Sequence, residues 1–548
     1  MSCAALPVSA ATAARSRDYF RQPGRFVLAL AAALSMAGIL LSAAPVQAAP
    51  GLPSTNVAWL PASTDADIDR AFTQARAEKK PVLLYWGAAW CPPCNQLKAT
   101  FFNRQEFAAQ AKSFVAVHVD GDRPGAQKLG ARFKVRGYPT VVLMTAEGAE
   151  ISRLPGAADA PQILAVLQAG LSGGRPVKAV LADARAGKAL NANEWRMLAF
   201  HGWEVDEDQL VPVADRPAVL AELARRNAAG PSPDAETTTR LWLKALAASD
   251  DGKGLRPDAA LQQLVDGVLA APARARVQMD VLVEGATDIV KVLSDNETPA
   301  RAALLARFDA ALALLQADAS LSRGDRVGAL IARVNLARLD QGKTVLQPRL
   351  AHGLLREVRE TSARMDREIT NGYERQAVIT MVAYMQGQAG LWADSDALLK
   401  ANLARSDSAY YLMSQLGGNA RKQGRKEEAL SWYQQAFDKS EGPATRLQWG
   451  AGYLAALVEL TPADAARIEK AAAQLLREAA LDKGAFYERS ARSLQRVGTR
   501  LQDWNKDGIH AAVLQRLRVQ LDEVCAGVDA ADGQRSSCEG LLRAGKAG

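Results

Sequence analysis

Two cysteines separated by a rigid spacer carry the clearest chemistry in this sequence. Residues 90–94 read Trp-Cys-Pro-Pro-Cys, and the chain of 548 residues holds only five cysteines. A pair spaced this closely is half of a metal site, a structural disulfide or a reversible redox couple. A zinc site needs two further thiolates or imidazoles, and the sequence has no second C-x-x-C and no H-x-x-H. We therefore expect no metal at Cys91 and Cys94.

The place of the pair along the chain favours the redox couple. Residues 81–87 ("PVLLYWG") form a short apolar run typical of a buried strand, and helical spacing follows over residues 94–112. Cys91 then lies at the start of a helix, where unpaired N–H groups and the positive end of the dipole favour its thiolate. A purely structural disulfide, the remaining alternative, would not need this position. We predict that Cys91, reachable from solvent, attacks a substrate disulfide and that Cys94, one turn inward and less exposed, resolves the mixed disulfide.

The elements around the pair predict an α/β domain over residues 58–173. Strand and helix patterns alternate there, and the last two strands read as a hairpin that turns at Glu147-Gly148. Asp65 is the expected N-cap of the first helix. Strands and helices in this order predict a sheet covered on both faces. The predicted elements are a helix over 65–80, a strand over 81–87, a helix over 94–112, a strand over 114–120, a helix over 125–135, a hairpin over 140–156 and a helix over 161–174.

This α/β segment resembles the thioredoxin fold. Residues 90–94 match the active-site motif of that family, and "VRGYPT" (Val135 to Thr140) matches its second signature, in which the proline is cis and faces the cysteines. The resemblance implies that Pro139 is cis and that Trp90, Tyr138 and Pro139 shape the substrate groove. It covers about a fifth of the chain and is most similar to the periplasmic reductase branch, including the C-terminal domain of membrane-bound disulfide reductases.

Two positions depart from the family pattern. The buried acid that many members carry six residues before the first cysteine is Tyr85 here, and the proline that often kinks the active-site helix is replaced by Ala99. His118 is an alternative base, but we expect it to be a structural residue at a strand end beside Asp120. His201 stands alone in the sequence and is also expected to be structural. The departures bear on the rate and pH dependence of the reaction rather than on its type.

The direction of electron transfer has only a weak signal. Pro92 and Pro93 contribute no N–H groups, so the Cys91 thiolate is less stabilised than one beside a donor such as histidine, which favours a reductant. No organic cofactor is expected. Electrons pass to or from another dithiol protein, and the substrates are protein disulfides.

The N-terminus predicts export. An arginine-bearing segment precedes the apolar run Phe26 to Ala44, and small residues at 46–48 suit signal peptidase. We predict a signal peptide over residues 1–48, a linker over 49–57 and a periplasmic mature protein; an uncleaved membrane anchor is the alternative. Disulfides persist in that compartment, and Cys3 leaves with the signal.

Composition and charge give no support to nucleic-acid binding. Charged residues make up 23% of the chain and aromatic residues 6%, which is typical of a soluble, helix-rich protein. The net charge is +8, of which the first 48 residues supply +3, and the remainder shows no basic stripe interleaved with aromatic residues.

Residues 174–508 predict an all-α region built from repeats. Strand signals end at Arg175, and amphipathic stretches separated by proline-containing turns follow. Residues 411–443 resemble a tetratricopeptide repeat, and a weaker copy lies 34 residues earlier. We expect a divergent α-solenoid whose concave groove recruits a partner protein or peptide. In the repeat, Leu416-Gly417 marks the helix crossing, Gly424 the turn, and Ala429 and Tyr433 the second helix. In the weaker copy, Gly390, Ser395 and Leu399 align with Gly424, Ala429 and Tyr433.

The last segment, residues 509–548, holds the two remaining cysteines. We expect Cys525 and Cys538 to form a structural disulfide between the last two helices. An electron relay with Cys91 and Cys94 is the alternative.

Together these features predict an exported thiol-disulfide oxidoreductase, a reductant of protein disulfides, joined to helical repeats that position its clients. A protein-binding scaffold is the first alternative, in which the helical region assembles partners while the redox pair senses or tethers. A disulfide isomerase is the second alternative, which a dimer would favour.

Overall fold

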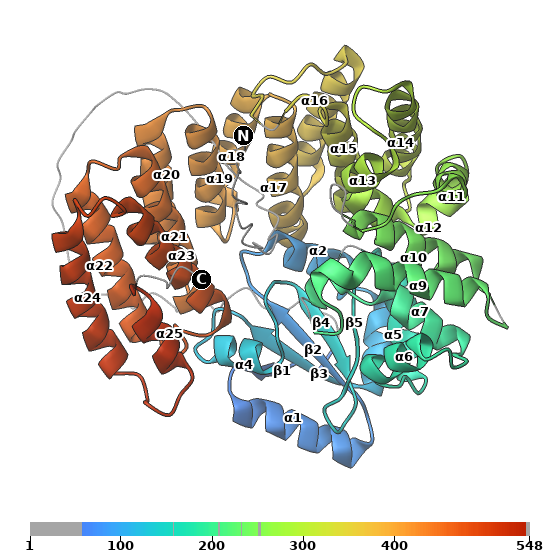
Figure 1. Ribbon diagram of the computed structural model, residues 1–548, viewed down its shortest axis with the longest axis horizontal. Helices are drawn as coiled ribbons and strands as arrows, with labels where there is room; N and C mark the ends of the chain where they lie inside the picture. Colours follow the sequence, from blue (N-terminus) through green and yellow to red (C-terminus); the bar gives the residue numbers. More distant parts are fainter. Residues whose placement is uncertain are drawn as a thin grey trace, which may run out of the picture.

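The computed structural model describes residues 57–156, 158–206, 209–231, 233–249, 254–342 and 344–543. The predicted signal peptide lies outside the described residues, as does all but the last residue of the predicted linker. An α/β domain is followed by helices alone, which curve around it so that the domain lies inside the arc (Figure 1). Among the described helices, none is long and apolar enough to cross a membrane. The predicted order, an α/β domain and then an all-α region, is confirmed.

A mixed sheet forms the centre of the α/β domain, with the strand order β1-β3-β2-β4-β5. β1, β2 and β3 run parallel, whereas β4 is antiparallel to β2 and β5 is antiparallel to β4. β2 is apolar throughout because it lies between two strands and is buried along its whole length. The strands are β1 (Leu60–Ala62), β2 (Val82–Gly87), β3 (Val115–Asp120), β4 (Thr140–Met144) and β5 (Glu150–Arg153).

Alternate residues of β2 enter two separate cores, one on each face of the sheet. Leu84 and Trp86 pack with α1 and α4, while Leu83 and Tyr85 pack with α2, α3 and α5. The sheet is therefore covered on both faces, as predicted. The helices of the domain are α1 (Asp65–Glu78), α2 (Pro92–Thr100), α3 (Gln105–Gln110), α4 (Ala126–Arg132) and α5 (Ala160–Leu171).

The single helix predicted over residues 94–112 is wrong, because α2 and α3 are separated by a turn. Phe101 and Phe102 follow α2 in this turn, and both are buried in the same core as Phe107. The turn lets both rings pack with Phe107, at centroid separations between 4.7 and 5.2 Å. Core packing thus overrides the helical pattern here.

Two predictions about chain turns have different outcomes. Asp65 is not the N-cap of α1, because Thr64 takes that place: its side chain accepts from the Asp67 amide, and the Asp67 carboxylate accepts from the Thr64 amide at 2.9 Å. This reciprocal pair satisfies two helix-terminal N–H groups at once. The hairpin of β4 and β5 is confirmed, and it turns through Gly148 at φ +92°.

From α6 onward the described chain has helices and no strands, and we call α6 to α25 the helical region. Neighbouring helices pack in order along the arc. The arc contacts the α/β domain at its start, where α7 packs against α5, in its middle, where α17 packs against α2, and near its end, where α23 packs against α4 (Figure 1). The helices are α6 (Val177–Arg185), α7 (Ala192–Phe200), α8 (Trp203–Asp206), α9 (Arg216–Ala228), α10 (Ala235–Ala248), α11 (Ala259–Leu269), α12 (Pro272–Val277), α13 (Met279–Leu293), α14 (Pro299–Ala317), α15 (Arg323–Ala337), α16 (His352–Glu368), α17 (Gly372–Gln388), α18 (Trp392–Asn402), α19 (Ala409–Lys422), α20 (Lys426–Lys439), α21 (Pro443–Leu460), α22 (Ala465–Leu481), α23 (Glu488–Trp504), α24 (Ala511–Ala526) and α25 (Gln534–Gly540).

The segment that resembles a repeat forms the helix pair α19 and α20. Gly424 turns the chain between them at φ +73°, and the aligned Gly390 has φ +79° between α17 and α18. Glycine adopts this left-handed conformation without a steric penalty. Gly417 lies against Tyr433, where an added Cβ would be 3.0 Å from the ring. The two helices therefore approach closely at the predicted crossing.

A disulfide joins the last two helices, between Cys525 of α24 and Cys538 of α25. Both cysteines are buried in the core of this end of the helical region. The loop between them carries Asp532, which accepts a hydrogen bond from the Tyr487 hydroxyl at 2.6 Å. Because Tyr487 directly precedes α23, the disulfide-closed loop supports the start of that helix.

Replacing both cysteines, as Cys525→Ala with Cys538→Ala, is expected to destabilise α24 and α25 by about 3 kcal/mol, because the bridge closes a loop with a sequence separation of 13. Hydrogen–deuterium exchange measures this as faster exchange of the α24 and α25 amides, with β2 and β3 unchanged as the internal control. Unchanged exchange in α24 and α25 would contradict the expectation.

Candidate active site

The first turn of α2 places Cys91 and Cys94, the dithiol pair, in contact. Cys91 is the N-cap, and its sulfur accepts a hydrogen bond from the Cys94 amide at 3.2 Å. The two cysteines form a disulfide with their Cα atoms 5.2 Å apart. Pro92 and Pro93 begin the helix with backbone angles suited to it but without N–H groups. When the pair is reduced, the Cys91 sulfur therefore faces the Cys94 N–H and the positive end of the helix dipole, which favours the thiolate.

The loop before β4 lies beside the dithiol pair. The peptide bond between Tyr138 and Pro139 is cis, as the resemblance implies. Tyr138 packs against the buried cluster formed by the two cysteines and Ala88, and its hydroxyl accepts a hydrogen bond from Gln127 at 3.0 Å. Burial raises the pKa of the Tyr138 hydroxyl, so this group stays protonated.

Cys91 is covered, and the prediction that solvent reaches it is wrong for this structure. Its exposed fraction is 2%, and that of Cys94 is 0%. The adjacent Trp90 packs against two rings of the helical region: Trp449 of α21 at 5.1 Å and Tyr411 of α19 at 5.9 Å. Cys91 itself packs with Ala88, Cys94, Trp90 and Tyr138 of the α/β domain. The ring contacts of Trp90 could not be predicted from the sequence of that domain, because Tyr411 and Trp449 belong to distant helices.

The Asp122 carboxylate, in the loop after β3, connects Trp90 to the helical region. It accepts a hydrogen bond from the Trp90 indole N–H at 2.9 Å and another from the Thr445 hydroxyl. Arg489 of α23 forms an ion pair with it. The Arg489 guanidinium also lies 5.1 Å from the Trp90 ring and 5.2 Å from the Tyr138 ring, within the range of cation–π attraction. The sequence analysis missed Asp122 and Arg489, and no motif marks the second.

Behind the dithiol pair, Tyr85 and His118 occupy neighbouring strands and stack at 5.0 Å. Burial, with lesser effects of Lys98 and Arg123, lowers the pKa of His118 to about 4. The imidazole is therefore neutral at neutral pH and a poor proton acceptor. This agrees with the expected structural role, although His118 lies within β3 rather than at its end.

Asp120 and Lys98 are two further buried groups near this end of the sheet. Asp120 ends β3 and pairs in register with Gly87, and burial raises the pKa of its carboxyl group, with a further contribution from Asp122. Burial lowers the pKa of the Lys98 ammonium group, an effect that Asp120 opposes. Asp120 and Lys98 are thus titratable groups at the end of the sheet where Tyr85 replaces the buried acid of the family pattern. Their burial is seen only in the folded structure.

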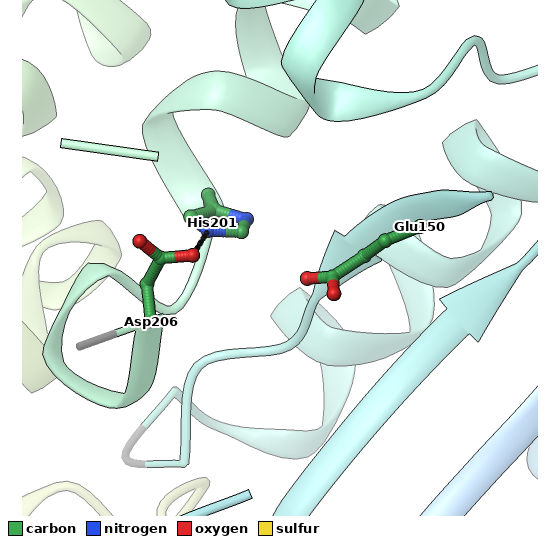
Figure 2. A group of neighbouring side chains, drawn as sticks. All are labelled: Glu150, His201 and Asp206. Atoms are coloured by element: carbon green, nitrogen blue, oxygen red, sulfur yellow. Dashed lines mark hydrogen bonds and ion pairs between the residues drawn. The ribbon is translucent and has the colours of Figure 1, made fainter. Parts of the chain in front are cut away.

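Glu150, His201 and Asp206 form a second cluster, with one potential ligand atom from each within 4.8 Å of the others (Figure 2). Each is already engaged: His201 Nε2 lies 3.2 Å from Asp206, and Glu150 binds the buried guanidinium of Arg153 at 2.9 Å. A cation here would lie beside that positive charge. The Arg153 amide donates to His201 Nδ1 at 3.4 Å, and the Gly202 amide donates to the Arg153 carbonyl at 2.8 Å. These bonds fasten the chain between α7 and α8 to β5, so His201 has the structural place expected of it.

Comparison with known proteins places the α/β domain in a family. Residues 68–171 match the family model of the thioredoxin-like domain. Thiol:disulfide interchange protein DsbD 2 of Pseudomonas aeruginosa is 32% identical over 120 residues, which are 21% of this chain and 20% of that protein. Disulfide bond reductase DsbH of Chlamydia pneumoniae is 28% identical over 99 residues, which are 15% of this chain and 57% of that protein.

Among solved structures, a thioredoxin from Thermus thermophilus is 28% identical, with a TM-score of 0.18, and the match covers 20% of this chain and 83% of that one. The chain spans about a fifth of the length of the first curated relatives it matches. The predicted thioredoxin-like fold class is confirmed by the family match.

The neutral, buried His118 predicts a pH-dependent stability. Its pKa is 6.5 in the unfolded chain and about 4 in the fold, so the unfolded state binds more protons between these values and acid destabilises the fold. The contribution is fully present above about pH 6.5 and is lost by about pH 4, by up to about 3 kcal/mol. His118→Phe keeps an aromatic ring against Tyr85 and removes the titration.

The unfolding free energy of His118→Phe relative to the wild type should therefore rise by about 3 kcal/mol on acidification from about pH 7 to about pH 4. Urea denaturation monitored by tryptophan fluorescence measures it. His352→Phe, at an exposed position, is the control and should follow the wild type. A constant difference between His118→Phe and the wild type would show that His118 is not the linked group.

Proposed function

We propose that this chain, which contains a thioredoxin-like domain, is a thiol-disulfide oxidoreductase that acts on protein disulfides through Cys91 and Cys94. The observation that carries the proposal is the Cys91–Cys94 disulfide at the start of α2, beside the cis bond before Pro139. The family match to residues 68–171 supports the same chemistry. So do the names of two relatives, a thiol:disulfide interchange protein and a disulfide bond reductase.

The reaction balances within the two dithiols. The reduced Cys91 thiolate attacks one sulfur of a substrate disulfide, whose S–S bond breaks as a mixed disulfide forms and the released substrate thiolate takes up a proton. Cys94 then loses its proton and attacks the Cys91 sulfur, which releases the second substrate thiol. The substrate gains two electrons and two protons, and the chain is left with the Cys91–Cys94 disulfide. Another dithiol protein restores the reduced pair, and no organic cofactor is required.

The proposed direction is reduction of the substrate. Pro92 and Pro93 present no N–H groups, so the thiolate has fewer hydrogen-bond donors than in an active-site turn with donor residues. A less stabilised thiolate corresponds to a more reducing pair. Trp90 and Tyr138 pack against the cysteines, and together with Pro139 they are the proposed substrate groove.

The remaining features are proposed from the sequence. Residues 1–48 are a signal peptide, residues 49–57 a linker, and the mature chain is periplasmic. The thioredoxin-like domain extends over residues 58–173, repeats related to the tetratricopeptide type over 174–508, and C-terminal helices over 509–548. The arc of helices from α6 to α25 supports a role for the helical region in binding partner proteins (Figure 1).

A redox-sensing scaffold is the second candidate function, and the burial of Cys91 is the observation that favours it. In that case the helical region binds partners, and oxidation or reduction of the dithiol pair alters its contact with the α/β domain rather than turning over substrates. The two functions differ in whether the purified protein catalyses disulfide reduction.

Replacement of Cys91 separates them. With dithiothreitol as the reductant, the wild type should accelerate the reduction of insulin disulfides, whereas Cys91→Ser should show the rate of dithiothreitol alone because no attacking sulfur remains. Turbidity from precipitating insulin chains measures the rate. Cys94→Ser should instead accumulate mixed disulfides on Cys91, which mass spectrometry of the trapped species identifies.

The variant with Cys525→Ala and Cys538→Ala is the control, since its cysteines lie in a separate core, and its rate of insulin reduction should not fall below that of the wild type. Equal rates for the wild type and Cys91→Ser would reject catalysis and leave the scaffold. A loss of activity in the control would instead favour the electron relay between the two cysteine pairs.

A further inference from the structure

The helical region contacts α2 along its length, not only at Trp90. The Gln376 side chain of α17 donates to the Trp90 carbonyl at 3.4 Å. One turn further on, the Gln96 side chain donates to the Ser322 hydroxyl at 2.7 Å. The helix that carries both cysteines therefore lies against α17 and the start of α15.

The start of α23 contacts the surroundings of Tyr138, a residue that packs against the dithiol pair. The Arg489 amide donates to the Gln127 side chain at 3.0 Å, and Gln127 in turn binds the Tyr138 hydroxyl. Arg492 donates to the Arg136 carbonyl at 2.6 Å, two residues before Tyr138. α23 thus occupies the surface formed by α4 and the loop that leads to Pro139, which borders Cys91.

This boundary has the composition of a contact that opens. Besides the rings around Trp90, the Lys98 ammonium of α2 lies 5.2 Å from the Tyr373 ring of α17. The other contacts described above are hydrogen bonds and the Arg489–Asp122 ion pair, whose side chains are 12% and 14% exposed. The Arg489 Nε is buried and has no hydrogen-bond partner among the residues that the structure describes. Polar boundaries between domains of one chain resemble transient interfaces, and an unpaired buried N–H adds a cost that separation relieves.

We propose that α17 to α23 form a gate that closes over Cys91, and that Arg489 is the latch of this gate. The proposal rests on the proposed function, because it describes regulation of the same dithiol pair. In the closed state no substrate disulfide reaches the Cys91 sulfur. Access requires α23 to leave the α/β domain, and a protein substrate that binds beside Tyr138 competes with Arg489 for that surface. The reactivity of Cys91 is then scaled by the fraction of molecules that are open.

Alkylation of Cys91 in the reduced, full-length protein tests the gate. Iodoacetamide modifies only the accessible thiolate, and peptide mass mapping separates Cys91 from the other cysteines. Arg489→Ala should accelerate alkylation about 10-fold or more, because it removes a buried, charge-assisted contact that holds the closed state. Arg489→Lys, which keeps the charge but loses the planar group between Trp90 and Tyr138, should give an intermediate rate.

Arg516→Ala is the matched control, since Arg516 is an exposed residue of α24 paired with Glu469 of α22, and it should react at the wild-type rate. Loss of a positive charge beside the dithiol pair disfavours the thiolate and slows alkylation, so acceleration in Arg489→Ala reports access. A wild-type rate in Arg489→Ala would overturn the gate.

A milder change covers the case in which Arg489→Ala fails to fold, as judged by thermal melting. Thr445→Val removes one hydrogen bond to Asp122 and should give a smaller acceleration, whereas a wild-type rate would overturn the gate. Alkylation does not depend on turnover. Faster alkylation of the Arg489 variants without insulin reduction by any variant would therefore reject the proposed function and keep the gate. Insulin reduction together with equal alkylation rates would keep the proposed function and reject the gate.

Discussion

The carboxylate of Asp122 joins the α/β domain to α21 and α23. Within the α/β domain it accepts a hydrogen bond from the Trp90 indole. From the helical region, the Thr445 hydroxyl donates a second hydrogen bond to it and Arg489 forms an ion pair with it. A largely buried carboxylate requires such donors, because an unpaired buried charge is strongly unfavourable. The group that orients Trp90 beside Cys91 therefore also fixes the helices that cover Cys91. One residue, Asp122, therefore both orients Trp90 beside the dithiol pair and fastens the helices that lie against Trp90.

The surroundings of the dithiol pair show how the fold accommodates the missing buried acid. Tyr85 takes that position and stacks on His118, and both groups stay uncharged at neutral pH because burial raises the pKa of the phenol and lowers that of the imidazole. Asp120 and Lys98 are titratable groups near this end of the sheet. Burial raises the pKa of the Asp120 carboxyl group and lowers that of the Lys98 ammonium group, so it favours the neutral form of each. The proton chemistry available behind α2 thus comes from different residues than the family pattern suggests.

Features that depend on local sequence were predictable, and features that depend on distant packing were not. The strands β2 to β5 and the helix that begins after Cys91 follow from patterns within one domain, and the cis bond at Pro139 follows from the family resemblance, whereas β1 was not predicted. The break between α2 and α3 was not predicted either, because the helical pattern of the sequence continues across it. The N-cap at Thr64 was missed because two capping residue types stand side by side and only backbone geometry selects one. The cover over Cys91 was out of reach, since Tyr411, Trp449 and Arg489 have no signature that pairs them with Trp90.

Asp122 and Arg489 are 367 residues apart in the chain. Contacts of the α/β domain join nearby segments, whereas those that enclose the cysteines require almost the whole polypeptide, and a chain is synthesised from its N-terminus. The thiols of a nascent molecule are thus assembled well before α23 has been translated. The dithiol pair is therefore complete within the first domain, whereas the contacts at its border form only after residues as distant as Arg489 have been added to the chain.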